Sequence, residues 1–227
     1  MDESLIRVIR ENYDGLASEY AGRLSDELRS KPLDRELLDR FVTKARGEVC
    51  DMGCGPGQVA RYLHAAGAAV FGMDISPGMI DEARKRNPGI RFQRGDMTAL
   101  DLEDNQLAGI AAFYAVVNVP KQSLPLIFAQ MHRVLQPGGV LLLAFHVGDE
   151  VLRPEELWGH RVTMDWHFFP SAEISRLLEG SGFRVEEVIE RPPYGPEIEH
   201  QSRRAYIFAI RPAQRELSSD AISEKQA

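Results

Sequence analysis

Cysteine is scarce in this sequence, which contains only Cys50 and Cys54 among its 227 residues. Two cysteines so close together cannot form the disulfide framework of a small secreted domain, and C-x-x-x-C alone is no metal-binding signature. Long hydrophobic runs are missing too. Those around residues 107–117 and 140–145 are shorter than the roughly 18 apolar residues of a membrane-spanning helix. We therefore expect no metal site and no membrane partner, and we interpret both runs as buried strands.

Positive charge is in deficit as well. The chain has 27 lysine and arginine residues against 34 aspartates and glutamates, a formal net charge of -7, which disfavours binding to a nucleic-acid backbone. It opens with MDESLIRVIRENY, which lacks the basic and then apolar segments of a signal peptide. We expect a cytoplasmic protein with no nucleic-acid partner, either a monomer or a homodimer.

The first 46 residues show no strand pattern and instead predict two helices. Pro32 separates them, and Asp34 is the expected N-cap of the second helix. We expect residues 1–46 to form a helical cap or lid. Apolar residues recur at helical spacing in both segments: Leu5, Val8, Ile9, Leu16 and Tyr20 in the first, and Leu33, Leu37 and Phe41 in the second.

From residue 47 onward, strand patterns alternate with helix patterns. Such alternation is typical of right-handed crossovers and of a parallel sheet with helices on both faces. It predicts an α/β fold with a Rossmann-like, doubly wound sheet. The predicted strands are 48–52, 69–74, 90–94, 110–116 and 140–145, and the predicted helices are 58–66, 79–86 and 123–135.

The last third of the chain has a different pattern. A short helix at 171–179 precedes two strand-like runs, FRVEEVIERPPY and RRAYIFAIRP, whose connection is short and rich in proline. Such a connection has no room for a crossover helix, so the two strands should pair antiparallel. We expect one α/β domain at 47–212, interrupted by an insertion near 146–170, and a polar tail at 213–227.

The stretch VCDMGCGPGQVARYL places three glycines, Gly53, Gly55 and Gly57, directly after a predicted buried strand and Asp51. Glycines at such a strand-to-helix turn let the backbone approach a ligand beside an electropositive helix N-terminus. Asp74 ends the next strand, 19 residues beyond Gly55, where a carboxylate can bind ribose hydroxyls. The segment from Gly55 to Ala60 also fits G-x-G-x-x-A, so an NAD-dependent oxidoreductase is an alternative at this point.

Further motifs favour another nucleotide site. The glycine run starts earlier, as D-x-G-x-G-x-G at 51–57, the third strand ends at Asp96 in RFQRGDM, and VLQPGGVLLL precedes the fifth strand. With these motifs the sequence resembles the class I S-adenosylmethionine-dependent methyltransferases, over about residues 13–211. The resemblance implies S-adenosylmethionine as cofactor and methyl transfer to a small molecule.

The resemblance also implies roles for individual residues. Backbone of Gly53 and Gly55 would approach the methionine part of the cofactor, and Asp51 would support that loop and the cofactor's amino group. Asp74 would bind the ribose and Asp96 the adenine amino group. Ile75 and Met97 would lie on the two sides of the adenine, and Gly57 belongs to the same turn. Tyr13 and Tyr20, on one face of a lid helix, and Tyr114 are the remaining expected cofactor contacts.

The acceptor side is less well defined. The fourth strand ends FYAVVNVP, so Asn118 stands where close relatives commonly have histidine, and an amide cannot act as a base near neutral pH. The insertion contributes Trp158, Trp166 and His167, which either roof the acceptor site or form a small core of their own. His146, at the end of the fifth strand, and His167 are the candidate general bases, and a purely structural role is the alternative for each.

We expect an enzyme that transfers a methyl group to an oxygen, nitrogen or sulfur atom of a small molecule by in-line displacement. Besides the oxidoreductase, the alternative is a cofactor-binding protein without catalysis. Arg203 and Arg204, near the last strand, could pair with an acidic substrate group or lie on a solvated face.

Overall fold

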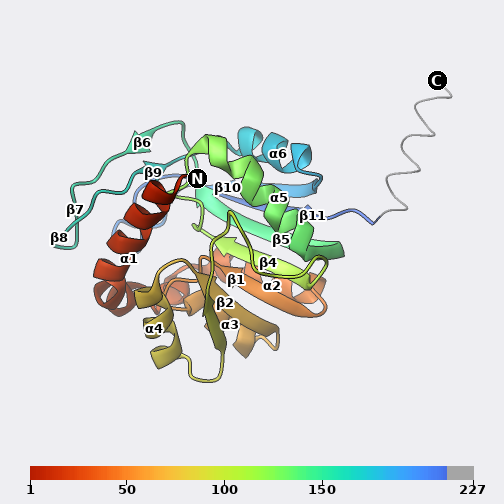
Figure 1. The fold of residues 1–227 in the computed structure, drawn as a ribbon, viewed down its shortest axis with the longest axis horizontal. Helices are drawn as coiled ribbons and strands as arrows, with labels where there is room; N and C mark the ends of the chain where they lie inside the picture. The colour runs from red at the N-terminus through yellow and green to blue at the C-terminus, as the bar shows by residue number, and fades with distance from the viewer. Residues whose placement is uncertain (214–227) are drawn as a thin grey trace.

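The computed structural model describes residues 1–213 of the chain. Its centre is a seven-stranded sheet in the order β10-β11-β5-β4-β1-β2-β3 (Figure 1). The pairs among β1 to β5 are parallel, whereas β11 pairs antiparallel with both β5 and β10. The predicted fold class and the antiparallel C-terminal strands are confirmed. The strands are β1 (Glu48–Met52), β2 (Ala69–Asp74), β3 (Arg91–Arg94), β4 (Leu107–Phe113), β5 (Leu135–His146), β10 (Arg184–Arg191) and β11 (Arg204–Ile210).

Helices cover both faces of this sheet, as Figure 1 shows. Residues of α2 and α3 pack on one face around Phe41 and Leu63, and residues of α5 and α6 pack on the other around Phe128 and Ile174. The helices are α1 (Glu3–Leu24), α2 (Pro32–Lys44), α3 (Gln58–Ala65), α4 (Pro77–Arg86), α5 (Leu124–Val134) and α6 (Ser171–Gly180), with short 3-10 helices η1 (Glu27–Ser30) and η2 (Lys121–Ser123). None of the helices within residues 1–213 is long and apolar enough to cross a membrane.

The start of α2 differs from the sequence prediction. Lys31 is the N-cap residue and Pro32 opens the helix, so the prediction that Asp34 caps it was wrong. Proline suits a first helical position because its missing N–H would have no partner there. Asp34 instead lies in the first turn of α2. Its side chain is buried and accepts a hydrogen bond from the Tyr206 hydroxyl at 2.6 Å.

Two strand boundaries also differ. The predicted strand 110–116 is β4, which ends at Phe113 because Tyr114 adopts a positive φ of 56°. That conformation is uncommon outside glycine and turns the chain out of the sheet. The predicted strand 140–145 starts earlier, at Leu135, because Leu135 still pairs with Leu107 of β4. Both changes lie at strand ends, which periodicity defines poorly.

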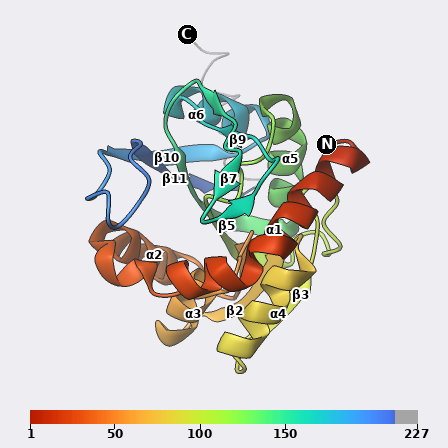
Figure 2. The same ribbon diagram turned by 90° about the vertical axis from the view of Figure 1, so that its left-hand side faces the viewer.

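The segment between β5 and α6 forms two small antiparallel ribbons. One pairs β6 (Val151–Leu152) with β9 (Trp166–His167), and the other pairs β7 (Glu156–Leu157) with β8 (His160–Arg161). Val162 and Met164 of this segment pack against Leu16 of α1, so the two parts cover the same edge of the sheet (Figure 2). The domain limits drawn from the sequence stay predictions. Of the predicted tail at 213–227, all but residue 213 lies outside the described residues.

Candidate active site

The turn after β1 has the geometry for which the sequence uses glycine. Gly53, Gly55 and Gly57 have φ values of 72°, 49° and 85°, in the left-handed region that other residues avoid. A side chain at position 53 would also place its Cβ 2.5 Å from the Cβ of Ala115, just beyond β4. The turn therefore lies tightly against the end of the neighbouring strand.

Asp74, at the end of β2, holds this turn in place. One of its carboxylate oxygens accepts a hydrogen bond from the Gly55 backbone N–H at 2.9 Å, and the other accepts one from the Ser76 N–H at 2.9 Å. Burial raises the pKa of Asp74, although these N–H groups oppose the shift. Asp74 thus fixes the backbone of the turn relative to the end of β2.

Asp51 and Gly57 lie at the two ends of the turn, Asp51 in β1 and Gly57 directly before α3. The buried carboxylate of Asp51 accepts a hydrogen bond from the Ala60 N–H in the first turn of α3 at 2.8 Å, and burial raises its pKa to about 7. In a dinucleotide site, the pyrophosphate binds at the N-terminus of this helix. Because the Asp51 carboxyl already occupies that helix end, the arrangement is unfavourable for a pyrophosphate.

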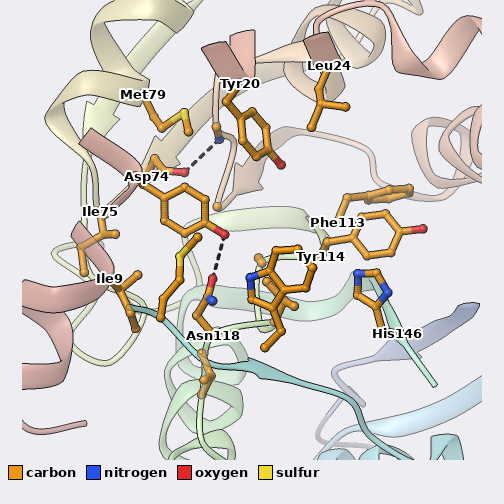
Figure 3. A pocket seen from close by; sticks show the side chains of 18 of the residues that line it. Ile9, Tyr20, Leu24, Asp74, Ile75, Met79, Phe113, Tyr114, Asn118 and His146 are labelled. Carbon is orange, nitrogen blue, oxygen red and sulfur yellow. Dashed lines mark hydrogen bonds between the residues drawn. The ribbon is translucent and has the colours of Figure 1, made fainter. Parts of the chain in front are cut away.

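A cavity of about 260 Å³ opens at the carboxyl ends of β1 to β5, beneath α1 (Figure 3). Most of the residues singled out in the sequence come together in its wall. Asp51 and Gly57 are outside the lining, as is His167, whose ring stacks on Phe169 with centroids 6.3 Å apart. The predicted residues that line the cavity are Tyr13, Tyr20, Gly53, Gly55, Asp74, Ile75, Asp96, Met97, Tyr114, Asn118, His146, Trp158 and Trp166.

One end of the cavity has the walls that an adenosine group needs. Ile75, Met79 and Met97 supply apolar surface, and the carboxylates of Asp74 and Asp96 lie at the same end. Adenine requires flat apolar contact and a few polar edges, and ribose requires a hydrogen-bond acceptor. The residues present therefore fit S-adenosylmethionine, and the predicted contacts Asp74, Gly53 and Gly55 all line this cavity.

The roof of the cavity is tied together by side chains from three segments. The Tyr13 hydroxyl of α1 donates a hydrogen bond to the Asn118 side-chain oxygen at 2.7 Å (dashed in Figure 3). The Asn118 amide nitrogen in turn donates to the Asp165 backbone carbonyl at 2.7 Å. Tyr20 makes edge-to-face contacts with both Tyr13 and Trp158. The helix, the turn after β4 and the insertion thus enclose one space.

His146 lines the other end of the cavity, which we call the acceptor end. Its Nδ1 lies 2.7 Å from the Ser202 hydroxyl, and its ring stacks on Phe168 with centroids 4.8 Å apart. Burial, together with the nearby positive charge of Arg204, lowers the pKa of His146 to about 2. His146 is therefore neutral at physiological pH.

Charged residues also line the acceptor end. They are Arg204, a candidate partner for an acidic substrate group from the sequence, and Glu27, Lys31 and Glu199, which the sequence did not single out. Lys31 pairs with Glu27 at 2.6 Å, and Glu199 lies 3.8 Å from Lys31 and 3.7 Å from Arg204. Arg204 is 2% exposed, whereas its neighbour Arg203 points outward to Glu190. The sequence contained the Arg203–Arg204 pair, but only the strand register distinguishes the buried arginine from the exposed one.

Comparisons with known proteins identify methyltransferases as relatives of this chain. Residues 49–139 match a family described as "Methyltransferase domain". The trans-aconitate 2-methyltransferase of Methylobacterium nodulans is 36% identical over 64% of this chain and 54% of its own length, so the match spans about half of that relative. The malonyl-[acyl-carrier protein] O-methyltransferase of Serratia marcescens is 28% identical over 79% of this chain and 71% of its own length.

Solved structures share the fold. The complex of DhpI with SAH has a TM-score of 0.73 at 21% identity and covers 94% of this chain and 100% of that one. An S-adenosylmethionine-dependent methyltransferase from Mesorhizobium loti has a TM-score of 0.63 at 24% identity, with 78% and 96% of the two chains covered. Residues 49–139 thus match a methyltransferase domain, and the glycine turn, the strand order and the solved structures agree with the fold of the class I S-adenosylmethionine-dependent methyltransferases.

Proposed function

We propose that this protein transfers a methyl group from S-adenosylmethionine to an oxygen, nitrogen or sulfur atom of a small molecule. The observation that supports this most directly is the continuity of the cavity. The same cavity runs from the Asp74–Gly55 hydrogen bond to His146 and Trp166. A donor and an acceptor bound in it would share a site that α1 and the insertion partly cover.

The contacts between α1, the turn after β4 and the insertion cover part of the cavity and favour a small acceptor. Methyl transfer requires alignment of the nucleophile with the methyl carbon and exclusion of water, and both follow from holding the reactants in one enclosed site. The names of the two curated relatives above specify trans-aconitate and malonyl-[acyl-carrier protein], which supports an acceptor group of metabolite size. A cytoplasmic location and the absence of a nucleic-acid partner stay predictions from the sequence.

Residue roles follow from the two ends of the cavity. Ile75, Asp96 and Met97 would hold the adenine, Asp74 the ribose, and Tyr13 and Tyr20 would cover the donor. Trp158, Trp166 and Asn118 would shape the acceptor space. His146 lines the acceptor end of the cavity, whereas His167, outside the cavity lining, is the weaker of the two candidate bases.

Calorimetry with S-adenosylhomocysteine and with NADH tests the cofactor, because a methyltransferase retains the first and an oxidoreductase the second. Incubation with methyl-labelled S-adenosylmethionine and a small-metabolite extract then tests catalysis. We expect S-adenosylhomocysteine binding and labelled product. NADH binding alone would contradict the proposal, and binding of S-adenosylhomocysteine without product would indicate a cofactor-binding protein that does not catalyse methyl transfer.

A further inference from the structure

The acceptor end has an unusual distribution of ion pairs. Arg191 donates hydrogen bonds to both carboxylate oxygens of Glu199, at 2.5 and 3.0 Å. Lys31 forms an ion pair with Glu27 at 2.6 Å. Arg204 lies 3.7 Å from a carboxylate oxygen of Glu199, and Glu199 is already paired with Arg191. Within the described residues, the buried Nε of Arg204 has no hydrogen-bond partner. Arg204 is thus the cation at the acceptor end with the weakest countercharge.

The remaining acid of this cluster does little to compensate Arg204. Asp34 contacts Arg191 at 3.4 Å and accepts the Tyr206 hydroxyl. Burial raises the pKa of Asp34, which weakens it as a countercharge. A buried cation without a close anion is costly, and an anionic ligand in the adjoining cavity would relieve that cost.

The second observation concerns the orientation of His146. Arg204 donates a hydrogen bond to the Ser202 hydroxyl oxygen, which lies 2.7 Å from Nδ1 of His146. The Ser202 hydroxyl can donate its proton to Nδ1, and the ring proton of His146 is then on Nε2. In that tautomer, a neutral His146 offers a hydrogen-bond donor and cannot accept a proton at Nε2.

Asn118 and Glu199, which also line the acceptor end, are unsuited to take a proton from an acceptor. Asn118 is an amide, already bonded to Tyr13 and to the Asp165 carbonyl. Burial alone would raise the pKa of Glu199, but Arg191, the Tyr194 N–H and Arg204 outweigh burial and lower it to about 2. An alcohol acceptor would need such a base, whereas a carboxylate is already ionised at neutral pH.

We propose that the acceptor is a small-molecule carboxylate, bound at the acceptor end near Arg204 and Lys31 and methylated on a carboxylate oxygen. This inference rests on the proposed function and specifies its substrate class. A carboxylate oxygen forms a bond to the methyl carbon of the sulfonium donor, the carbon–sulfur bond breaks, and its electron pair stays on sulfur. The products are a methyl ester and a neutral thioether, and no proton has to move.

The product distinguishes this proposal from methylation of other groups. The protein is incubated with methyl-labelled S-adenosylmethionine and a panel of mono-, di- and tricarboxylic acids, each beside its amide and its alcohol analogue. Methyl esters release volatile labelled methanol in mild base, whereas ethers, amines and thioethers do not. We expect base-labile label with acids only. Label in an amide or alcohol, or a base-stable product, would overturn the carboxylate assignment but leave methyl transfer intact.

A neighbouring arginine provides the matched control. Arg204→Gln should raise KM for the accepted acid at least tenfold while S-adenosylhomocysteine affinity stays within about twofold, and Arg203→Gln should change neither. If Arg204→Gln no longer binds S-adenosylhomocysteine, Lys31→Met makes the same comparison. Unchanged KM in the folded variants, or an equal rise in Arg203→Gln, would overturn the binding site. Absence of any labelled product despite S-adenosylhomocysteine binding would contradict both the carboxylate acceptor and the proposed activity.

Discussion

The backbone N–H of Gly55 donates a hydrogen bond to the carboxylate of Asp74 at 2.9 Å, which joins the glycine turn after β1 to the end of β2. We also propose that Asp74 binds the ribose, which would give this carboxylate a second role. Asp74→Ala removes both, and we expect S-adenosylhomocysteine affinity to fall by about 1–3 kcal/mol, because hydrogen bonds to a charged group are lost. Calorimetry measures this change.

Asp81→Ala is the control for Asp74→Ala, because Asp81 is an exposed acid on the neighbouring helix α4. It should leave the affinity unchanged. Equal affinity in wild type and folded Asp74→Ala would remove Asp74 from the cofactor site.

Gly53→Ala tests how closely the turn approaches β4. The new methyl group would lie 2.5 Å from Ala115 Cβ, and the residue would also have to keep a φ of 72°. We expect S-adenosylhomocysteine binding to be lost or reduced more than tenfold, as calorimetry will show. Gly67→Ala distinguishes backbone strain from the steric contact, because Gly67 also has a positive φ, 92°, but nothing lies within 4 Å of an added Cβ. Gly67→Ala should therefore cost only about 1 kcal/mol of stability and no affinity, and a similar loss of affinity in both variants would contradict the contact.

Local motifs point to the residues that we propose hold the cofactor, and they point less clearly to the acceptor end. Gly53, Gly55 and Asp74 lie within a few residues of strand ends, and parallel strands bring their carboxyl ends to one edge. Local motifs therefore suffice to place them. The same logic predicted the sheet and its C-terminal antiparallel strands, and it failed only where a cap or strand end depended on neighbours, as at Asp34 and Tyr114.

The acceptor end depends on contacts that no local pattern records. Lys31, Glu199 and Arg204 come from the start of α2, the loop before β11 and β11 itself, and only the folded sheet brings them together. In sequence, charged residues most often indicate exposed positions. Arg203 and Arg204 show the difficulty, because Arg203 lies just before β11 and is exposed, whereas Arg204 begins β11 and is buried, and composition alone cannot say which is which.

The Tyr13–Asn118 hydrogen bond is the direct polar link between α1 and the turn after β4. Tyr13→Phe removes it and leaves the Asn118 oxygen without that partner, so we expect S-adenosylhomocysteine affinity to fall by about 0.5–1.5 kcal/mol. The chain's two tryptophans, Trp158 and Trp166, both line the cavity, so ligand binding can be followed by intrinsic fluorescence. Tyr62→Phe is the control, because its hydroxyl bonds exposed Asp39 away from the cavity. A loss of affinity in Tyr62→Phe as large as in Tyr13→Phe would argue against the link.

The pH dependence of turnover tests the state of His146. Burial and Arg204 lower its pKa to about 2, so in the folded protein it stays neutral as the pH falls from 8 to 5.5. A carboxylate acceptor is also ionised throughout this range. We therefore expect kcat with a carboxylic acid to be nearly constant, measured by label transfer at saturating donor. A histidine acting as a base with an ordinary pKa would instead cause roughly a tenfold fall in kcat per pH unit below about 6.5.

The same shift affects stability with a definite sign. In the unfolded chain His146 takes up a proton below its ordinary pKa near 6.5, whereas in the folded chain it does so only near pH 2. Its contribution to stability is therefore complete above pH 6.5 and is lost as the pH falls from 6.5 toward 2. His146→Gln cannot titrate, so the difference in unfolding free energy between wild type and variant, from urea melts, should shrink as the pH is lowered from 7 to 5. A constant difference would mean that His146 is already exposed enough to be protonated in the folded protein, and the donor role at the acceptor end would then be untenable.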